Sequence, residues 1–409
     1  MGSEGHARGG TTYRRLTLAM LFAGFSTFSL LYAVQPLLPL FADQYRLSAA
    51  GASLAVSLAT GPLAVGILVA GAVSDRVGRR PLMVWAMIAA GALTLAAAAA
   101  PGWGALLAFR LLTGVALAGV PAVAMAYVAE EVDAASVGAA MGLYIAGSAL
   151  GGMGGRLVAS LVADLAGWRS ALAVVGLLGL AMGEAFRRLA PPSRRFARSA
   201  LPPRAVLAQT KRLFADAALP LLYAEAFLLM GIFVTIYNYA GFRLLAPPYA
   251  LGQAAVGAVF LLYLLGSASS AWFAGLAGRM GRRRVFWVPI AIAIAGTALT
   301  LARPLGVFVA GIGVVTIGFF GAHSIASAWV GRRATGQRGQ AAALYLFFYY
   351  LGSSVLGSAG GVAWSRYGWA GVAGFCLVAG VVALILGLVL RGVPPLIVEP
   401  PPGASIPEA

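Results

Sequence analysis

The sequence GAVSDRVGRR at residues 71–80 joins two apolar runs, 49–73 and 82–100, each long enough to cross a bilayer. Glycines permit a tight turn, and arginines hold such a turn at an anionic membrane face. A similar sequence, GRMGRR at residues 278–283, recurs 203 positions later with glycine in place of Asp75. The pattern predicts a short cytoplasmic turn between membrane helices in each half of the chain. The alternative is a charged hairpin with no further role.

The composition excludes a water-soluble enzyme. Of the 409 residues, 61% are apolar and 10% are charged, whereas soluble domains are about 45–50% apolar and about 25% charged. The single cysteine, Cys376, allows no intrachain disulfide, and the two histidines, His6 and His323, are few for a protein-only metal site. We therefore expect a protein that is not an enzyme, with no catalytic residue, no metal and no cofactor beyond a proton gradient.

Runs of about 20 apolar residues bounded by charge, proline or glycine predict transmembrane helices. Twelve such runs are present: 16–41, 49–73, 82–100, 103–128, 137–162, 168–190, 218–242, 253–277, 285–302, 305–330, 340–365 and 369–391. The chain is therefore expected to be an all-α polytopic membrane protein.

The placement of arginine and lysine predicts the orientation in the membrane. With the N-terminus in the cytoplasm, 22 of the 29 basic residues fall on the cytoplasmic side and five on the other, and Arg110 and Arg156 lie inside helices. By the positive-inside rule both termini are cytoplasmic, and we expect a bacterial inner-membrane location. The net charge of +17 is then a topology signal, so the expected partner is the lipid bilayer and not nucleic acid.

An internal repeat divides the chain into two halves. The pattern GxAxxLY at 138–144 recurs 201 residues later at 339–345, and the pair Gly167-Trp168 recurs as Gly368-Trp369. The Pro-rich basic stretch 191–217 is the one long connection. These observations predict a six-helix bundle over 1–190, a basic cytoplasmic linker over 191–217, a six-helix bundle over 218–392 and a disordered cytoplasmic tail over 393–409.

Several motifs carry a family resemblance. The sequence at 71–80 resembles the signature loop of the major facilitator superfamily. Three more resemble its twelve-helix drug:proton antiporter branch: QPLLP at 35–39, RLLTG at 110–114, and GSALGG at 147–152, where Ser148 replaces the expected proline. The runs 151–169 and 231–239 are similar to the YnfM-type inner-membrane transporters.

This resemblance implies two pseudo-symmetric six-helix bundles and a function. The expected function is a monomeric secondary transporter that exports small amphipathic organic compounds or drugs in exchange for protons by rocker-switch alternating access. Because Ser148 departs from the antiporter motif, proton-coupled or facilitative uptake of a small metabolite stays open. A membrane receptor or scaffold is the non-transporting alternative.

The resemblance also implies a conformational switch in the first turn. Its residues are Gly71, Asp75, Arg76, Gly78, Arg79 and Arg80. In the family picture, Asp75 secures the cytoplasmic closure against the eleventh helix in the outward-open state.

Charged and polar groups inside the membrane are functional candidates, because an intramembrane ion needs a partner or a water-filled cavity. Counting helical rise places Gln35, Arg110 and Arg156 in the outer layer, where they can line a central cavity. The resemblance implies proton coupling for Arg110; alternatively it is a structural cation bonded to backbone carbonyls. Arg156 either faces the cavity or extends to the interface and pairs with Asp164, and Gln35 is either a ligand group or a helix-packing hydrogen bonder.

Glu225 and His323 fall at similar depth in the inner half. A carboxylic acid in a low-dielectric cavity can bind and release a proton as access to water alternates, which antiport requires. Glu225 is either this carboxylate or an interfacial glutamate, and His323 is either a proton carrier or a satisfied core histidine.

Tyrosine rings together with the Asn238 amide are expected to form an aromatic, weakly polar wall of the substrate cavity. Such walls suit amphipathic or cationic organic compounds, although packing alone also explains many such rings. The candidates are Tyr237, Asn238, Tyr239, Tyr263, Tyr345, Tyr349 and Tyr350.

Gly147, Gly151 and Gly155 recur every four residues and predict a stripe for close helix packing, to which the resemblance adds Gly152 and a role in preventing leak.

Overall fold

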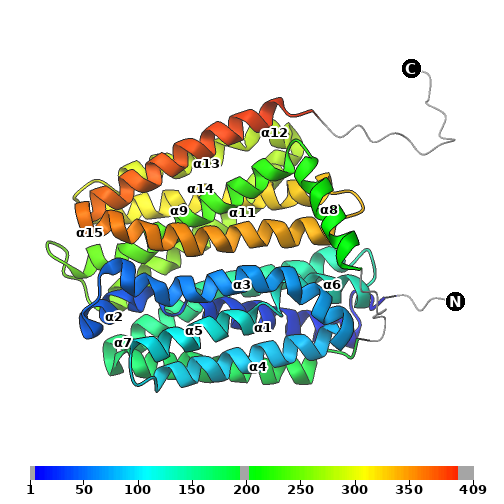
Figure 1. Ribbon diagram of the computed structural model, residues 1–409, viewed down its shortest axis with the longest axis horizontal. Coiled ribbons are helices and arrows are strands. Elements are labelled where there is room, and N and C mark those ends of the chain that lie inside the picture. The colour runs from blue at the N-terminus through cyan, green and yellow to red at the C-terminus, as the bar shows by residue number, and fades with distance from the viewer. Residues whose placement is uncertain (1–4, 194–201, 395–409) are drawn as a thin grey trace.

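The computed structural model describes residues 5–193 and 202–394. All the secondary-structure elements in those ranges are helical (Figure 1). The all-α membrane fold predicted from the sequence is therefore confirmed. The tail residues 1–4 and 395–409, and residues 194–201 of the expected linker, lie outside the described residues.

The N-terminal half runs from the first helix to the end of α7. Its elements are α1 (Thr11–Tyr32), the 3-10 helix η1 (Gln35–Leu37), α2 (Leu38–Tyr45), α3 (Ala49–Val77), α4 (Arg79–Ala98), α5 (Trp103–Leu117), α6 (Pro121–Glu131) and α7 (Val137–Leu189).

The connection to the second half contains the amphipathic helix α8 (Pro203–Ala215), within the stretch expected as a solvated linker. The elements that follow are α9 (Leu219–Leu245), α10 (Gln253–Ala258), η2 (Val259–Leu262), α11 (Tyr263–Met280), α12 (Arg282–Val285), α13 (Trp287–Leu299), α14 (Leu305–Arg333) and α15 (Arg338–Gly392).

Nine helical stretches in the described ranges are long and apolar enough to cross a membrane. The two longest, α7 and α15, each contain one glycine with non-helical angles, Gly167 (φ 78°) and Gly368 (φ 58°), so each consists of two spans joined at a sharp bend. The predicted span 285–302 corresponds to α12 and α13, which are separated only by Phe286. When α7 and α15 are each divided at their glycine, and α12 and α13 are counted together as one further span, the structure contains the twelve predicted spans.

The internal repeat is visible in the backbone. Gly167 and Gly368 bend their helices at equivalent positions, and Gly78 (φ 101°) and Gly281 (φ 88°) form the two repeated turns. Positive φ of this kind is readily adopted only by glycine. The repeat therefore fixes equivalent turns in the two halves.

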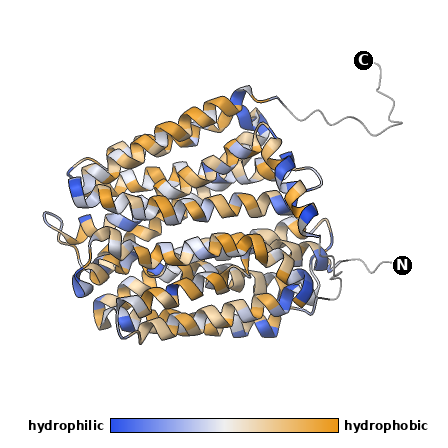
Figure 2. Ribbon diagram, in the orientation of Figure 1, coloured by the Kyte–Doolittle hydropathy of each residue, from blue (hydrophilic) through white to orange (hydrophobic). Residues whose placement is uncertain are grey.

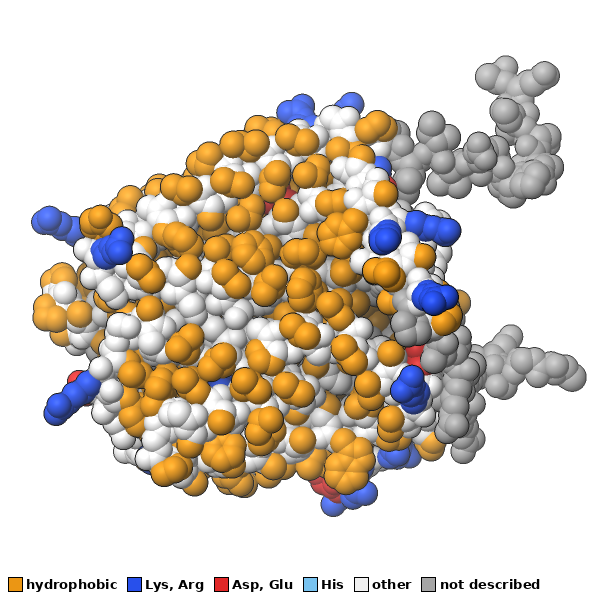
Figure 3. Space-filling model, viewed as in Figure 1, with side chains coloured by type: hydrophobic (Ala, Val, Ile, Leu, Met, Phe, Trp, Pro, Cys, Tyr) orange, Lys and Arg blue, Asp and Glu red, His pale blue; other side chains and the backbone are white. Residues whose placement is uncertain are grey.

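The two halves lie side by side, with α3 packed along α15 and α10 packed against α7 (Figure 1). Apolar residues cover the length of the helices, and hydrophilic residues gather at the helix ends (Figure 2). On the face shown in Figure 3, apolar side chains form a broad belt with Lys and Arg at its margins. The belt has the composition of a lipid-facing surface.

Candidate functional site

A chain of hydrogen bonds crosses between the two halves at the centre of the molecule. Arg156 of α7 donates from Nε to Gln35 Oε1 (2.6 Å), and Gln35 Nε2 donates to Asn238 Oδ1 of α9 (2.7 Å). Arg156 and Gln35 belong to the N-terminal half and Asn238 to the C-terminal half. All three side chains are at most 2% exposed. The structure thus brings together three residues that the sequence proposed separately for one cavity.

Aromatic rings surround the Arg156 guanidinium. Its central carbon lies 4.6 Å from the ring centre of Tyr32 and 5.1 Å from those of Phe260 and Tyr263. A second hydrogen bond runs from Arg156 Nη1 to the Gly152 carbonyl oxygen. Arg156 therefore faces the centre, and its proposed partner Asp164 instead accepts from the backbone N–H of Gln253 (3.0 Å).

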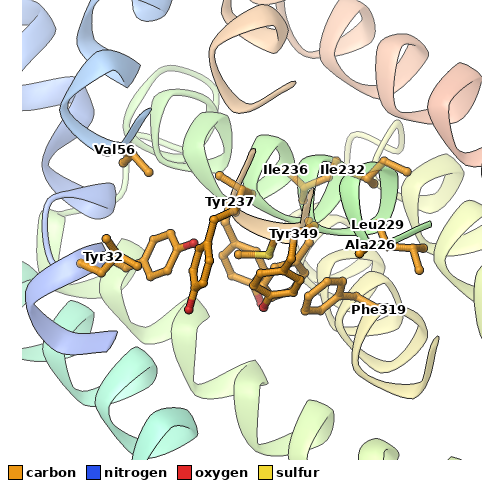
Figure 4. Packing of buried hydrophobic residues seen from close by; sticks show 14 of the residues in the cluster. Tyr32, Val56, Ala226, Leu229, Ile232, Ile236, Tyr237, Phe319 and Tyr349 are labelled. Atoms are coloured by element: carbon orange, nitrogen blue, oxygen red, sulfur yellow. The ribbon is translucent and has the colours of Figure 1, made fainter. Parts of the chain in front are cut away.

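Several of the aromatic residues expected in the cavity wall pack in one row, which extends to Tyr32 of the N-terminal half. Figure 4 shows Tyr32 of the N-terminal half beside Tyr237 and Tyr349, with Phe319 next in the row. Tyr237 lies 5.3 Å from Tyr263 between ring centres, and its hydroxyl bonds to Thr316 Oγ1 (2.8 Å). Every ring named here is at most 8% exposed, so the wall is closed in this conformation.

His323 lies at the end of this wall nearer the chain termini. Its Nδ1 bonds to the Tyr345 hydroxyl (2.9 Å), and its ring centre lies 4.8 Å from that of Tyr349. His323 is thus hydrogen-bonded in the arrangement of a satisfied core histidine. A role in proton transfer stays a prediction.

Glu225 lies on a different face of α9 from Asn238. It is 0% exposed, and within the described chain neither carboxyl oxygen has a hydrogen-bond partner. Oε1 lies 3.5 Å from the position that a Cβ would take at Gly387, a position also close to Ile290 and Phe286. Glu225 is therefore buried in the C-terminal half, and its role in proton transfer stays a prediction.

Arg110 is held entirely by the backbone of the N-terminal half. Nε donates to Ala55 O (2.9 Å), Nη1 to Leu30 O (2.8 Å) and Nη2 to Leu31 O. Helix α1 ends at Tyr32, so the last carbonyls of that helix lack helical partners and Arg110 supplies their donors. These contacts match the structural alternative, and proton coupling by Arg110 stays a prediction.

Ion pairs and hydrogen bonds connect the loop 71–80 to other parts of the N-terminal half. Arg79 forms ion pairs with Asp75 (2.6 Å) and with Glu130 at the end of α6 (2.9 Å). Arg80 donates to the carbonyl oxygens of Ala190 (2.8 Å) and Arg187 (2.6 Å) at the end of α7. Arg76 is exposed and Gly71 has open space around it. In this conformation Asp75 is thus engaged by Arg79, and the latch to the eleventh helix stays a prediction.

The glycine stripe packs helix α1 against the first part of α7. A Cβ at Gly147 or Gly151 would overlap the carbonyl oxygens of Leu21 and Phe25, and one at Gly155 would lie 2.6 Å from the Cα of Ser29. Gly152 is on another face, where a Cβ would lie 3.3 Å from Arg156 Nη1. Gly152 therefore belongs to the central site and the other three to the helix contact.

The sequence did not single out the serines that join α3 to α15. Ser57 Oγ and Ser358 Oγ are 2.6 Å apart, and Ser57 Oγ also donates to Ser354 O (2.9 Å). Tyr32 OH bonds to Ser353 Oγ (3.2 Å) in the same interface. Serines in apolar helices signal interhelical bonding, but nothing in one sequence says which helix they face. These bonds close the end of the molecule opposite the termini.

The described ranges contain no group of three or more His, Cys, Asp or Glu residues that could hold a metal ion.

Comparisons with known proteins place this architecture among transporters. The Major Facilitator Superfamily profile matches residues 20–254. The chain is 43% identical to the inner membrane transport protein YnfM of Escherichia coli K12, over 93% of this chain and 91% of that protein. It is 41% identical to the MFS-type transporter YybF of Bacillus subtilis 168, over 94% and 96%. A crystal structure of the nucleoside transporter NupG superposes with a TM-score of 0.73 at 18% identity, covering 92% and 99% of the two chains.

Proposed function

The chain belongs to the Major Facilitator Superfamily, and from that premise we propose that it exports small organic compounds in exchange for protons by alternating access of its two six-helix halves. Its relatives YnfM and YybF are named as transporters, and the chain is a transporter of the same superfamily. By analogy with YnfM, we place it in the inner membrane, and the arginine distribution supports cytoplasmic termini.

The observation that carries the proposal is the hydrogen-bond chain Arg156–Gln35–Asn238. It joins one half to the other through the Gln35 side chain, which reaches Asn238 Oδ1 and, at 3.4 Å, the Val234 carbonyl oxygen, and aromatic rings surround Arg156. Separation of the halves would break the Gln35–Asn238 bond and the contacts of Arg156 with Phe260 and Tyr263, and it would open the Arg156 surroundings to water. A polar centre of this kind supports ligand exchange at an interface that opens and closes.

Glu225 supports the proton-coupling part of the proposal. A buried carboxyl without hydrogen-bond partners is favoured as the neutral acid, and it ionises when water or a cation reaches it. Glu225 lies on the same helix as Asn238, about three and a half turns away, so movement of α9 can change the surroundings of both side chains together. Each proton that moves down 100 mV supplies roughly 2.3 kcal/mol for substrate export.

The test begins with a resistance screen in cells that lack their own export pumps, which identifies a compound whose toxicity falls when the chain is expressed. Efflux of that compound from proteoliposomes is then measured with and without an imposed pH gradient. Export by antiport predicts faster efflux when the gradient drives protons in the opposite direction. Equal efflux with and without the gradient contradicts proton coupling.

Glu225→Gln is the matched variant for this assay. It keeps the size of the side chain and removes the titrating group, so we expect efflux that no longer responds to the pH gradient while counterflow of the same compound continues. Glu184→Gln, at a partly exposed position paired with Arg187 and Arg188, is the control and should keep the response. A normal gradient response in Glu225→Gln would assign the proton to another group.

A further inference from the structure

The central arginine Arg156 has only neutral polar partners. Its hydrogen bonds go to the Gln35 amide oxygen and to the Gly152 carbonyl oxygen, and the remaining neighbours of its guanidinium are the rings of Tyr32, Phe260 and Tyr263. We propose that this site binds an organic anion, with a carboxylate or similar group on Arg156 and an apolar body against the aromatic wall. The proposal rests on the transport function above and names its substrate class.

None of the ion pairs in the described chain involves Arg156, and six of its nine acidic residues have contacts elsewhere. Those paired with arginine are Asp75 and Glu130 on Arg79, Glu184 on Arg187 and Arg188, and Asp216 on Arg333. Asp164 accepts from Gln253 N, and Glu225 Oε1 lies 3.5 Å from the position that a Cβ would take at Gly387. Within residues 5–193 and 202–394, the full positive charge of Arg156 is therefore left without a carboxylate.

The other buried arginine of the spans, Arg110, has different partners, and the comparison supports a ligand-binding role for Arg156 alone. Arg110 bonds to three backbone carbonyls of its own half, including the C-terminal end of α1, whose dipole favours a cation. Arg156 has one backbone carbonyl, and its other acceptor is the side chain that reaches across to Asn238. When the halves part, Arg156 faces the opening while Arg110 stays enclosed.

The chemistry of the surrounding rings also favours an anion. The faces of Tyr32, Phe260 and Tyr263 that would attract a cation are already occupied by the guanidinium, so a second cation would meet like charge in a low-dielectric site. The sequence alone suggested a wall suited to amphipathic or cationic compounds, but it could not show that Arg156 contacts that wall. The planar guanidinium instead matches a carboxylate, which it can bind through two parallel hydrogen bonds.

The experiment uses ligand sets that differ only in charge: 3-phenylpropionate, 3-phenylpropanamide and 3-phenylpropylamine, with the corresponding cyclohexyl and indole sets. The readout is the change in thermal unfolding temperature of the purified full-length chain, which needs neither a gradient nor turnover. We expect the anion of at least one set to stabilise the wild-type chain more than its amide and amine. The proposal is overturned if only amides or amines stabilise the chain, or if no anion of any set stabilises it.

Arg156→Gln should weaken binding of that anion by about tenfold to a hundredfold, since a charge-assisted hydrogen bond is replaced by a neutral one. Arg156→Lys keeps the charge and should retain the preference for anions, which keeps the test decisive if Arg156→Gln folds poorly. Arg366→Gln removes the same charge from an exposed position and should bind as wild type. Unchanged anion binding in a folded Arg156→Gln overturns the proposal.

The outcome is separable from that of the proposed function. Anion-selective binding without any effect of a pH gradient on transport would remove the antiport and keep the anion site. Gradient-driven transport of a neutral or cationic compound, with no anion binding, would keep the antiport and remove the anion site.

Discussion

At the scale of single residues, the two intramembrane arginines differ in their contacts: Arg110 binds backbone carbonyls of its own half, and Arg156 lies in the central site. Both were visible in the sequence, but their partners were not, because two of the three carbonyls that hold Arg110 become free only where α1 ends before Pro36. The direction of Arg156 likewise depends on how closely the glycine stripe lets α1 approach α7. The residue types could be predicted from membrane energetics, and the contacts required the packed helices.

Replacement of Arg110 tests the structural assignment. Arg110→Met removes the donors to three buried carbonyl oxygens, and we expect it to lower the free energy of unfolding by about 3 kcal/mol or more. Thermal unfolding of the purified protein, followed by tryptophan fluorescence, measures the effect. A variant with wild-type stability but transport that ignores the pH gradient would show that coupling, and not structure, is the main role of Arg110.

Asp216 was missed by the sequence analysis and joins α8, α9 and α14. Its Oδ1 accepts from the N–H groups of Ala218 (2.8 Å) and Leu219 (2.9 Å), and the carboxylate pairs with Arg333 (2.7 Å). Partial burial opposes the charged form, but the Arg333 hydrogen bond and the two backbone donors together lower the pKa of the Asp216 carboxyl below its usual 3.8. The residue lies outside the spans, so its titration is accessible to buffer.

This lowered pKa predicts a pH dependence of stability. Because the unfolded chain binds the proton more readily, ionised Asp216 stabilises the folded state above pH 3.8, and the contribution is lost as the pH falls through the lower folded-state pKa. Asp216→Asn should therefore lower stability by about 1 kcal/mol near neutral pH, a value limited by solvent screening. Unfolding temperatures measured from about pH 7 to about pH 3 should converge for the two proteins. A constant difference across that range would contradict the assignment.

At the scale of elements, the apolar runs and the glycine spacing predicted the helices and one of their contacts. The interruptions were harder to place. The bends at Gly167 and Gly368 are single residues with positive φ, and the breaks near Pro36 and Pro121 shorten α1 and α5. The helix α8 within the polar connection has a moderate apolar face that its Pro-rich and basic composition hides. Local propensity is weak evidence at such positions because packing decides them.

A pair of glycine variants on the first part of α7 tests the helix contact. Gly151→Ala places a methyl group against the Phe25 carbonyl oxygen, so α1 must move away, and we expect a loss of about 1–3 kcal/mol in stability. Gly142→Ala lies in open space on the same helix and should be neutral or stabilise by about 0.5–1 kcal/mol. Chemical or thermal unfolding measures both. Equal effects of the two variants would contradict close packing at Gly151.

At the scale of the whole molecule, the count of spans and the repeat predicted the two-bundle fold, because bilayer thickness constrains helix length and the motif spacing is nearly constant. How the bundles meet could not be predicted. The serine contacts between α3 and α15 and the Gln35–Asn238 bond depend on which faces the two halves turn to each other. Those contacts close the end opposite the termini, and alternating access requires them to break during each cycle.

A disulfide across that closed end tests alternating access most directly. Ser57→Cys and Ser358→Cys, in a chain whose single cysteine is changed by Cys376→Ala, replace two hydroxyls that lie 2.6 Å apart. Transport of the screened compound is measured in proteoliposomes before oxidation, after oxidation and after reduction, with each single variant as a control. We predict that oxidation stops transport only in the double variant and that reduction restores it. Undiminished transport by fully cross-linked protein would contradict the account.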